Sequence, residues 1–164
     1  MLQPITVRDA DLWHSGQQEA IVSLLNAYAS DPMGGGQALT DEVRAALIPG
    51  LQQLSSSRVF LAWEGDVAVG IAVCFLGFST FAARPLLNIH DLAVLASHRR
   101  RGVGRLLLEH VAQAARALGC CKLTLEVRED NTPAQRLYHE VGFDTTAAYG
   151  GAVRVWFLEK RLRG

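Results

Sequence analysis

The sequence predicts a single mixed α/β domain in which one sheet carries helices on both faces. A chain of 164 residues is long enough for one domain with its own core. Short apolar segments of strand length alternate with longer segments of helical periodicity. A strand, a helix and a strand follow one another over residues 87–127, which favours a parallel crossover, whereas strands joined by short turns favour antiparallel pairs. A mixed sheet satisfies both patterns.

The first half of the chain contains two predicted helices. Apolar residues at helical spacing predict a helix over residues 12–29, which ends before the three consecutive glycines at 34–36. Thr40, followed by two acidic residues, predicts the start of a second helix, and Pro49 predicts its end near Ile48. The predicted strands of this half are residues 5–7, 58–63 and 67–75, with a loop at residues 78–85.

The second half alternates strands and helices. Strands are predicted at residues 87–94 and 122–127, and helices at 103–118 and 131–141. The first of these helices has an apolar stripe of Val103, Leu107, Val111, Ala114 and Leu118. Two final strands, 143–149 and 153–158, are expected to flank a turn at Gly150-Gly151.

Composition and charge narrow the classes of function. The formal net charge is zero, whereas a protein that binds nucleic acid non-specifically usually carries a basic excess. The three cysteines, two of them adjacent, match neither a disulfide framework nor a zinc site, and Cys120 and Cys121 are expected to pack in the core. No apolar segment has the length of a membrane span, and the N-terminus lacks a signal pattern. We therefore expect a cytoplasmic protein without a metal.

A glycine-punctuated basic segment lies between a predicted strand and a predicted helix. It reads Arg99-Arg100-Arg101-Gly102-Val103-Gly104. The first N–H groups of a helix lack partners within the helix and, together with the helix dipole, favour an anion such as a diphosphate. Leu107 stands where a dinucleotide-binding loop would have its third glycine, and no P-loop lysine is present. A plain glycine helix entry with a solvated basic face is the alternative.

Two motifs resemble those of the GCN5-related N-acetyltransferase (GNAT) family. The first is Arg99-x-x-Gly102-x-Gly104, and the second is the segment 131–143, which matches Asn-x-x-Ala-x-x-x-Tyr-x-x-x-Gly-Phe. The resemblance covers essentially residues 1–164 and implies a mostly antiparallel sheet of six to seven strands with a V-shaped splay between the fourth and fifth. It also implies acetyl-CoA as co-substrate. The implied CoA-binding residues are Leu92, Ala93, Val94, Arg99, Arg100, Arg101, Gly102, Val103, Gly104, Arg105, Asn131, Ala134 and Tyr138.

The resemblance implies transfer of the acetyl group to a primary amine by direct attack, through a tetrahedral intermediate. Such a reaction needs a neutral amine, a donor to the oxyanion and a proton for the leaving thiolate. By resemblance, Tyr138 supplies that proton, and the amide of Leu92 or Val94 is the oxyanion donor. An aromatic residue that only packs on the sheet is the alternative for Tyr138.

The base is expected on the strand 87–94. His90, with an ordinary pKa near 6.5, suits the task, and Asp91 and a water molecule are the other candidates. Strand alternation places His90 and Asp91 on opposite faces, so only one of them reaches the substrate unless a β-bulge intervenes.

The acceptor is predicted to be the amine of a small molecule. Residues 75–94 resemble the diamine, polyamine and thialysine acetyltransferase branch, but His90 stands where those relatives commonly have Glu. Asp31, Asp41 and Glu42 are candidates to attract a cation, or only helix-start acids. A protein or peptide N-acetyltransferase, a non-catalytic CoA-binding module and an RNA-binding surface over residues 99–105 are the alternatives. A homodimer is expected, since the apolar final strand would allow one.

Overall fold

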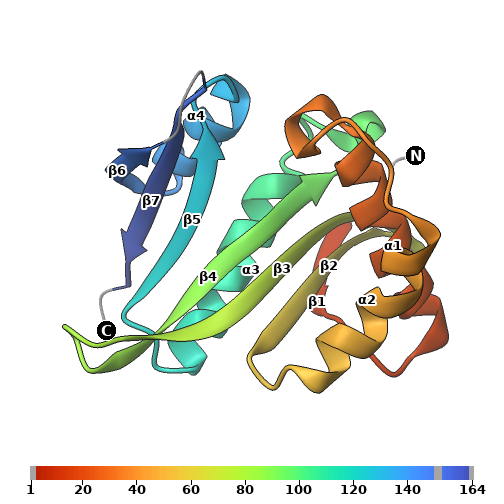
Figure 1. The fold of residues 1–164 in the computed structure, drawn as a ribbon, viewed down its shortest axis with the longest axis horizontal. Coiled ribbons are helices and arrows are strands. Elements are labelled where there is room, and N and C mark those ends of the chain that lie inside the picture. The colour runs from red at the N-terminus through yellow and green to blue at the C-terminus, as the bar shows by residue number, and fades with distance from the viewer. Residues whose placement is uncertain (1–2, 150–152, 163–164) are drawn as a thin grey trace.

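The computed structural model describes residues 3–149 and 153–162, and its elements follow the predicted order (Figure 1). The helices of this part are α1 (Ser15–Ser30), α2 (Asp41–Gln53), α3 (Val103–Ala117) and α4 (Thr132–Glu140), with 3₁₀ turns η1 (Pro32–Gly34) and η2 (Ala96–His98). The strands are β1 (Ile5–Asp9), β2 (Ser57–Glu64), β3 (Val67–Ser79), β4 (Arg84–Val94), β5 (Lys122–Arg128), β6 (Asp144–Tyr149) and β7 (Val155–Arg161). The predicted Gly150-Gly151 turn lies outside the described residues. None of the described helices combines the length and the apolar character needed to cross a bilayer.

Within the described residues, the strands form one sheet in the order β1-β2-β3-β4-β5-β7-β6. All neighbours are antiparallel except β4 and β5, which are parallel and are joined through α3. Their pairing covers only residues 87–89 of β4 and 123–125 of β5, and beyond it the two strands diverge (Figure 1). The predicted mixed sheet, with a splay between its fourth and fifth strands, is confirmed.

The helices α3 and α4 cover one face of the sheet (Figure 1). The buried side of α3 consists of Val103, Leu107, Leu108, Val111, Ala112 and Ala115. Gly70 of β3 lies beneath the start of this helix, where an added Cβ would come within 3.1 Å of the Val103 and Leu107 side chains. A side chain at position 70 would therefore push the first turn of α3 away from the sheet.

The helices α1 and α2 cover the opposite face (Figure 1). Ile21 of α1 is fully buried, and Ile48 and Leu51 of α2 pack in the same cluster. Each fully buried aliphatic side chain of this size contributes about 1.5–3 kcal/mol to folding. The first helix starts three residues later than predicted, at the His14 cap, whose ring nitrogen accepts the Gln17 N–H at 3.4 Å.

The second helix continues through Pro49 to Gln53, so the predicted end near Ile48 is wrong. A proline inside a helix loses one main-chain hydrogen bond and costs about 3 kcal/mol. Ile48 and Leu51, on either side of it, are both buried against the sheet. Burial of two such side chains offsets that cost.

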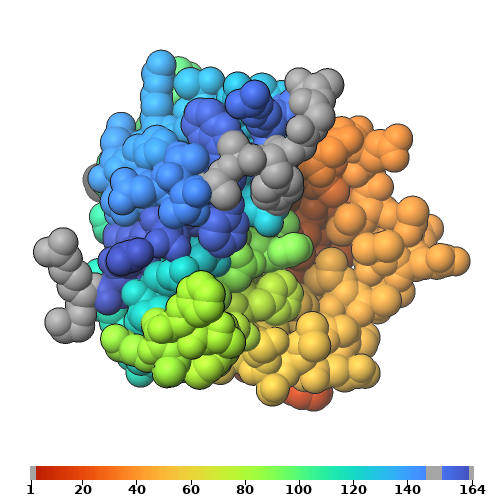
Figure 2. Space-filling view, turned by 60° about the vertical axis from the view of Figure 1, so that its left-hand side comes forward, coloured from red at the N-terminus to blue at the C-terminus, as the bar shows by residue number. Residues whose placement is uncertain are grey.

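The hairpin between β3 and β4 is longer than predicted, because residues expected to form a loop at 78–85 continue the ladder. Phe78 pairs with Pro85 and Ser79 with Arg84, which leaves a tight turn at residues 80–83. Phe78 is 62% exposed and Phe81 is fully exposed, so the tip gains almost nothing from the core. Figure 2 shows this hairpin in yellow-green at the surface of the molecule. Local apolar patterning underestimated it because main-chain pairing, not burial, extends the strands.

The cysteines are free thiols within the described structure. Cys120 is buried and Cys121 is half-buried, at the junction between α3 and β5. The predicted packing role is confirmed for Cys120.

Candidate functional site

Beside the splay between β4 and β5, three predicted regions lie close together. Leu92 and Val94, beyond the last paired residue of β4, pack in the same cluster as Ala134 and Tyr138 of α4. The start of α3 contacts α4 as well, since the Arg105 guanidinium donates to the Glu140 carboxylate at 2.7 Å. The end of β4, the start of α3 and the inner side of α4 therefore lie close together. Ala93 points to the other face of the sheet, toward α1 and α2.

The loop from β4 to α3 presents a row of main-chain donors. Within the described chain, the N–H groups of residues 100–105 make no hydrogen bond to the protein. The first helical bond is from Leu106 N–H to Gly102 C=O at 3.1 Å. Free N–H groups at a helix start, aligned with the helix dipole, bind anions. The residues present thus fit the diphosphate of CoA without help from any side chain.

The two loop glycines serve different purposes. Gly102 has a φ of +79°, a left-handed conformation that glycine adopts freely, and a Cβ there would meet no atom within 4 Å. Gly104 has a helical backbone, and a Cβ there would lie 2.9 Å from Leu137 of α4. Gly102 therefore leaves the space in front of the N–H groups open, whereas Gly104 allows α3 and α4 to approach each other.

Most basic side chains of the segment turn back onto the protein. The Arg99 guanidinium donates to Asp31 at 2.6 Å, and Arg101 is paired with Glu64. His98 lies 2.8 Å from the same Glu64 carboxylate. These contacts hold the pKa values of the Asp31 and Glu64 carboxyls below their usual range. The local positive potential expected from three arginines is thus largely neutralised.

A β-bulge in β4 changes which residues face the acceptor side. Val73 of β3 is opposite Asp91 and Cys74 is opposite Ile89, so His90 has no partner. Asp91 lies on the face of its partner Val73, which packs against α1 and α2. The His90 ring packs edge-on against Phe75 of the same cluster, with ring centroids 5.6 Å apart. His90 and Asp91 therefore lie on the same face of the sheet, because the β-bulge interrupts the alternation of side chains along the strand.

Asp91 is half-buried and makes no hydrogen bond or ion pair within the described chain. Burial raises the pKa of this carboxyl, and the neighbouring His90 only partly opposes the shift. A carboxylate with a raised pKa is a stronger base than an exposed one. Asp91 thus combines basicity with free lone pairs.

Tyr28, in the last turn of α1, belongs to the same site and was not among the predicted site residues. Burial raises the pKa of its phenol, and the negative charges of Asp91 and Asp31 raise it further. Tyr28 in turn contributes to the raised pKa of Tyr138. Tyr28 therefore lies near both Asp91 and Tyr138. No local signal distinguishes such a tyrosine from a core residue, because its spacing is that of the helix's buried side.

Tyr138 is 7% exposed, and its ring packs against Phe143 with centroids 5.9 Å apart. Burial raises the pKa of its phenol, so the group stays protonated at neutral pH. Within the described residues its hydroxyl donates to no other group.

Two polar residues position the helix that carries Tyr138. The Asn131 side chain caps α4 by accepting the Ala134 N–H at 3.3 Å. The buried Gln135 amide donates to the carbonyl groups of Arg128 and Glu129 at 2.8 and 2.7 Å. Gln135 thus joins α4 to the end of β5. It was not predicted, because a glutamine in a helix ordinarily faces solvent.

The acidic residues considered as attractors of a cation are mostly engaged elsewhere. Asp31 is bound by Arg99 and also accepts the Met33 N–H at 2.9 Å. Asp41, at the start of α2, is paired with Arg44. These contacts support the alternative reading, in which the acids stabilise chain turns and helix starts.

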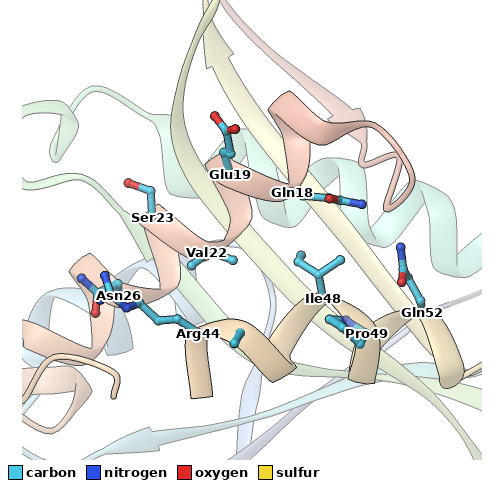
Figure 3. A pocket seen from close by; sticks show the side chains of 10 residues that line it. Gln18, Glu19, Val22, Ser23, Asn26, Arg44, Ile48, Pro49 and Gln52 are labelled. Atoms are coloured by element: carbon cyan, nitrogen blue, oxygen red, sulfur yellow. The ribbon is translucent and has the colours of Figure 1, made fainter. Parts of the chain in front are cut away.

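A surface groove of about 610 Å³ lies between α1 and α2 (Figure 3). None of the predicted site residues lines it. Two of its polar side chains, Gln18 and Gln52, donate to the Leu12 carbonyl at 2.7 and 2.8 Å. Asn26 accepts the Leu39 N–H at 2.9 Å. The lining amides thus tie the two helices to neighbouring loops, and the groove is separate from the site at the splay.

Three curated proteins are similar to part of the chain. Streptothricin acetyltransferase of Streptomyces lavendulae is 38% identical over 89 residues, which are 54% of this chain and 46% of that protein. The [ribosomal protein bS18]-alanine N-acetyltransferase of Salmonella typhimurium is 41% identical over 57 residues, 35% of this chain and 38% of that protein. Thialysine N-epsilon-acetyltransferase of Bos taurus is 32% identical over 88 residues, 53% of this chain and 51% of that protein. The chain thus spans about half the length, or less, of these relatives.

The fold is shared over nearly the whole chain with the structure of yncA from Salmonella typhimurium, solved with its cofactor acetyl-CoA. The TM-score is 0.75 at 24% identity, and the match covers 97% of this chain and 94% of that one. The model of the acetyltransferase (GNAT) family matches residues 21–143, from α1 to the segment after α4. The match includes the splay, the loop before α3 and Tyr138, and on this basis the chain belongs to the acetyltransferase (GNAT) family.

Proposed function

We propose that this chain is an acetyl-CoA-dependent N-acetyltransferase that acetylates a primary amine of a small molecule. One observation carries the proposal: within the described residues, main-chain donors without a protein acceptor and the protonated phenol of Tyr138 lie beside the same end of β4. The acetyl thioester supplies the activated acyl group when it is bound there. The protein has to hold it, to accept a proton from the amine and to return one to the thiolate.

In this proposal the N–H groups of residues 100–105 hold the diphosphate, and the exposed edge of β4 beyond Ile89 holds the pantetheine arm. The N–H of Leu92 or Val94 stabilises the developing negative charge on the acyl oxygen. Tyr138 donates the proton to the leaving thiolate, because its raised pKa keeps it protonated at neutral pH.

Asp91 is the base that we favour, since it is half-buried, makes no hydrogen bond or ion pair within the described residues and has a raised pKa. It approaches from the α1 side of β4, whereas Tyr138 approaches from the α4 side. An amine that enters beside α1 thus gives its proton to Asp91 on one side of the thioester, and the thiolate receives its proton on the other. The exposed His90 beside Asp91 carries the proton onward to solvent.

The acceptor class rests on the relatives. Streptothricin acetyltransferase, with the longest of the three aligned segments, supports a small-molecule amine, and so does the thialysine enzyme. The bS18-alanine relative supports the second candidate, N-acetylation of a protein or peptide. The protonated phenol of Tyr138 beside the end of β4 argues for a catalyst over a binding module.

We further propose a cytoplasmic homodimer. The final strand β7 is paired with β5 on one side and β6 on the other, so a dimer would not extend the sheet through it. Sedimentation velocity measures the oligomeric state, and a monomer at all concentrations would remove this part of the proposal.

The experiment is a thiol-release assay with acetyl-CoA and a panel of acceptors, namely polyamines, thialysine, amino acids and short peptides. Turnover on one small amine, with no release from peptides, supports the proposal. Turnover on peptides alone favours the second candidate. Acetyl-CoA binding without turnover on any acceptor would leave only a binding module and would overturn the catalytic assignment.

A further inference from the structure

The loop before α3 is clamped by a residue from a distant strand, Glu64 at the end of β2. One oxygen of its carboxylate is paired with the Arg101 guanidinium, and the other lies 2.8 Å from His98 Nε2. The side chains of Glu64 and His98 are only 17% and 15% exposed, so the contact is largely shielded from solvent. The second ring nitrogen of His98 lies 2.8 Å from the Ser97 hydroxyl.

The two contacts flank a strained residue. Arg100, between His98 and Arg101, has a φ of +59° although it is not a glycine. A left-handed conformation at such a residue persists only when its surroundings impose it. Within the described residues, Glu64 contacts the chain on both sides of Arg100, at His98 before it and at Arg101 after it.

The contacts of Glu64 with His98 and Arg101 restrain the segment that presents the free N–H groups. The unbonded donors begin at Arg100 and continue to Arg105. The loop is also held at its start, where the Leu95 N–H donates to the Val69 carbonyl at 2.9 Å. Val69 is the extra residue of a bulge between β2 and β3, which follows the turn after Glu64. The β2–β3 hairpin therefore supports both ends of the loop.

We propose that Glu64 is a positioning residue for acyl-CoA recognition: it holds His98 and Arg101 so that the N–H groups from Arg100 onward form a preorganised diphosphate cradle. This inference rests on the proposed function. Arg101 then acts as a structural brace and not as a direct phosphate ligand, because its guanidinium is committed to Glu64. A preorganised loop binds more tightly, since less order has to be created upon binding.

The positioning role and simple electrostatics predict opposite signs. Glu64 carries a negative charge beside an anion site, so its removal should strengthen CoA binding if charge alone mattered. If Glu64 positions the loop, Glu64→Gln weakens binding instead, by about tenfold, because two side chains and a strained turn lose their restraint. The kcat at saturating acetyl-CoA should stay unchanged, since Glu64 does not border Tyr138 or Asp91.

A matched control is available two residues further on. Asp66, in the turn between β2 and β3, is exposed and has no ion pair within the described chain. Asp66→Asn removes the same charge from the same hairpin without touching the loop. It should leave acetyl-CoA affinity within about twofold of wild type.

The experiment is calorimetric titration of acetyl-CoA into wild type, Glu64→Gln, Arg101→Gln, the double variant and Asp66→Asn. The expected result is weaker binding by both single variants and no loss in the double variant beyond that of Glu64→Gln, because Arg101 acts through its contact with Glu64. Equal or tighter binding by Glu64→Gln, while wild type binds, would overturn this inference alone. Absence of binding by wild type would overturn the proposed function, and the inference with it.

A ligand-free measurement separates positioning from unfolding. The His98 and Arg99 N–H groups donate to the carbonyl groups of Leu95 and Ala96 within the loop. Glu64→Gln should accelerate hydrogen exchange at these two amides in the absence of CoA, while the amides of β2 and β3 keep their protection. Unchanged exchange at His98 and Arg99 would show that Glu64 does not hold the loop, and accelerated exchange throughout the hairpin would show general destabilisation in place of positioning.

Discussion

The substitution Tyr138→Phe removes one oxygen from the proposed proton donor and leaves the rest of the side chain in place. The ring is 7% exposed and packs on Phe143, and the hydroxyl has no partner in the described chain. The free energy of unfolding should therefore change by no more than about 0.5 kcal/mol. A positioned general acid contributes about 10²–10⁴ to the rate. The kcat should fall by that factor, which corresponds to about 3–5 kcal/mol of transition-state stabilisation.

Steady-state thiol release, with acetyl-CoA varied at a saturating acceptor, separates the two kinetic parameters. Loss of a donor that acts only in the transition state lowers kcat and leaves the KM for acetyl-CoA nearly unchanged. Thermal unfolding of the same preparations provides the control for folding. A raised KM with an unchanged kcat would refute the assignment, since it would make Tyr138 a binding residue.

Three further substitutions test other parts of the site. Burial raises the pKa of Asp91 in the folded protein. The free energy of unfolding is therefore highest below the ordinary carboxyl pKa of about 3.9, and it falls as the pH rises through the raised pKa, because the folded protein disfavours the ionised carboxyl. Asp91→Asn should remove this slope from thermal unfolding across pH 4–8 and abolish the acidic limb of kcat/KM; an unchanged pH profile would dismiss Asp91 as the base. Gly104→Val places a branched side chain on a Cβ position that is 2.9 Å from Leu137, so it should lower the Tm by a few degrees, and Leu137→Ala should partly restore it; no recovery in the double variant would contradict the packing role. Gln135→Ala leaves two main-chain carbonyl groups without their donor and should cost about 1–3 kcal/mol in urea unfolding, with a lower kcat; a loss in stability with normal kcat would separate α4 from catalysis.

The elements that depend on short-range patterns were predictable from the sequence. The third helix has apolar residues at regular helical spacing and glycine at both ends, and the structure buries most of the predicted stripe. The strand, helix and strand over residues 87–127 predicted the one parallel pair in the sheet, β4 with β5. The spacing of apolar residues predicts each helix and strand, and the length of the connection between two strands predicts whether they are parallel.

The bulge at His90 was not predictable in the same way. Alternation along a strand assigns faces only if the partner strand keeps its register, and the slip depends on how β3 and β4 meet. Its consequence is large, since one unpaired residue brings His90 and Asp91 onto the same face.

The ion pairs of the basic loop could not be predicted from the sequence either. Arg99 and Arg101 were expected to raise the potential of the anion site, but their partners, Asp31 and Glu64, lie far away in the sequence. No local pattern reports such contacts. Tyr28 and Gln135 were missed for a related reason, because their role follows from which strands and helices the fold brings beside them.

Our central proposal is that the loop before α3 and the splay beside β4 form the binding site for acetyl-CoA. Calorimetric titration of acetyl-CoA into the wild-type protein tests it most directly, with desulfo-CoA as a second ligand that keeps the diphosphate and lacks the thiol. We predict saturable binding of one molecule per chain for both ligands, since the diphosphate is held by main-chain N–H groups. Absence of saturable heat with acetyl-CoA would contradict the reading of residues 99–105 and, with it, the proposed function.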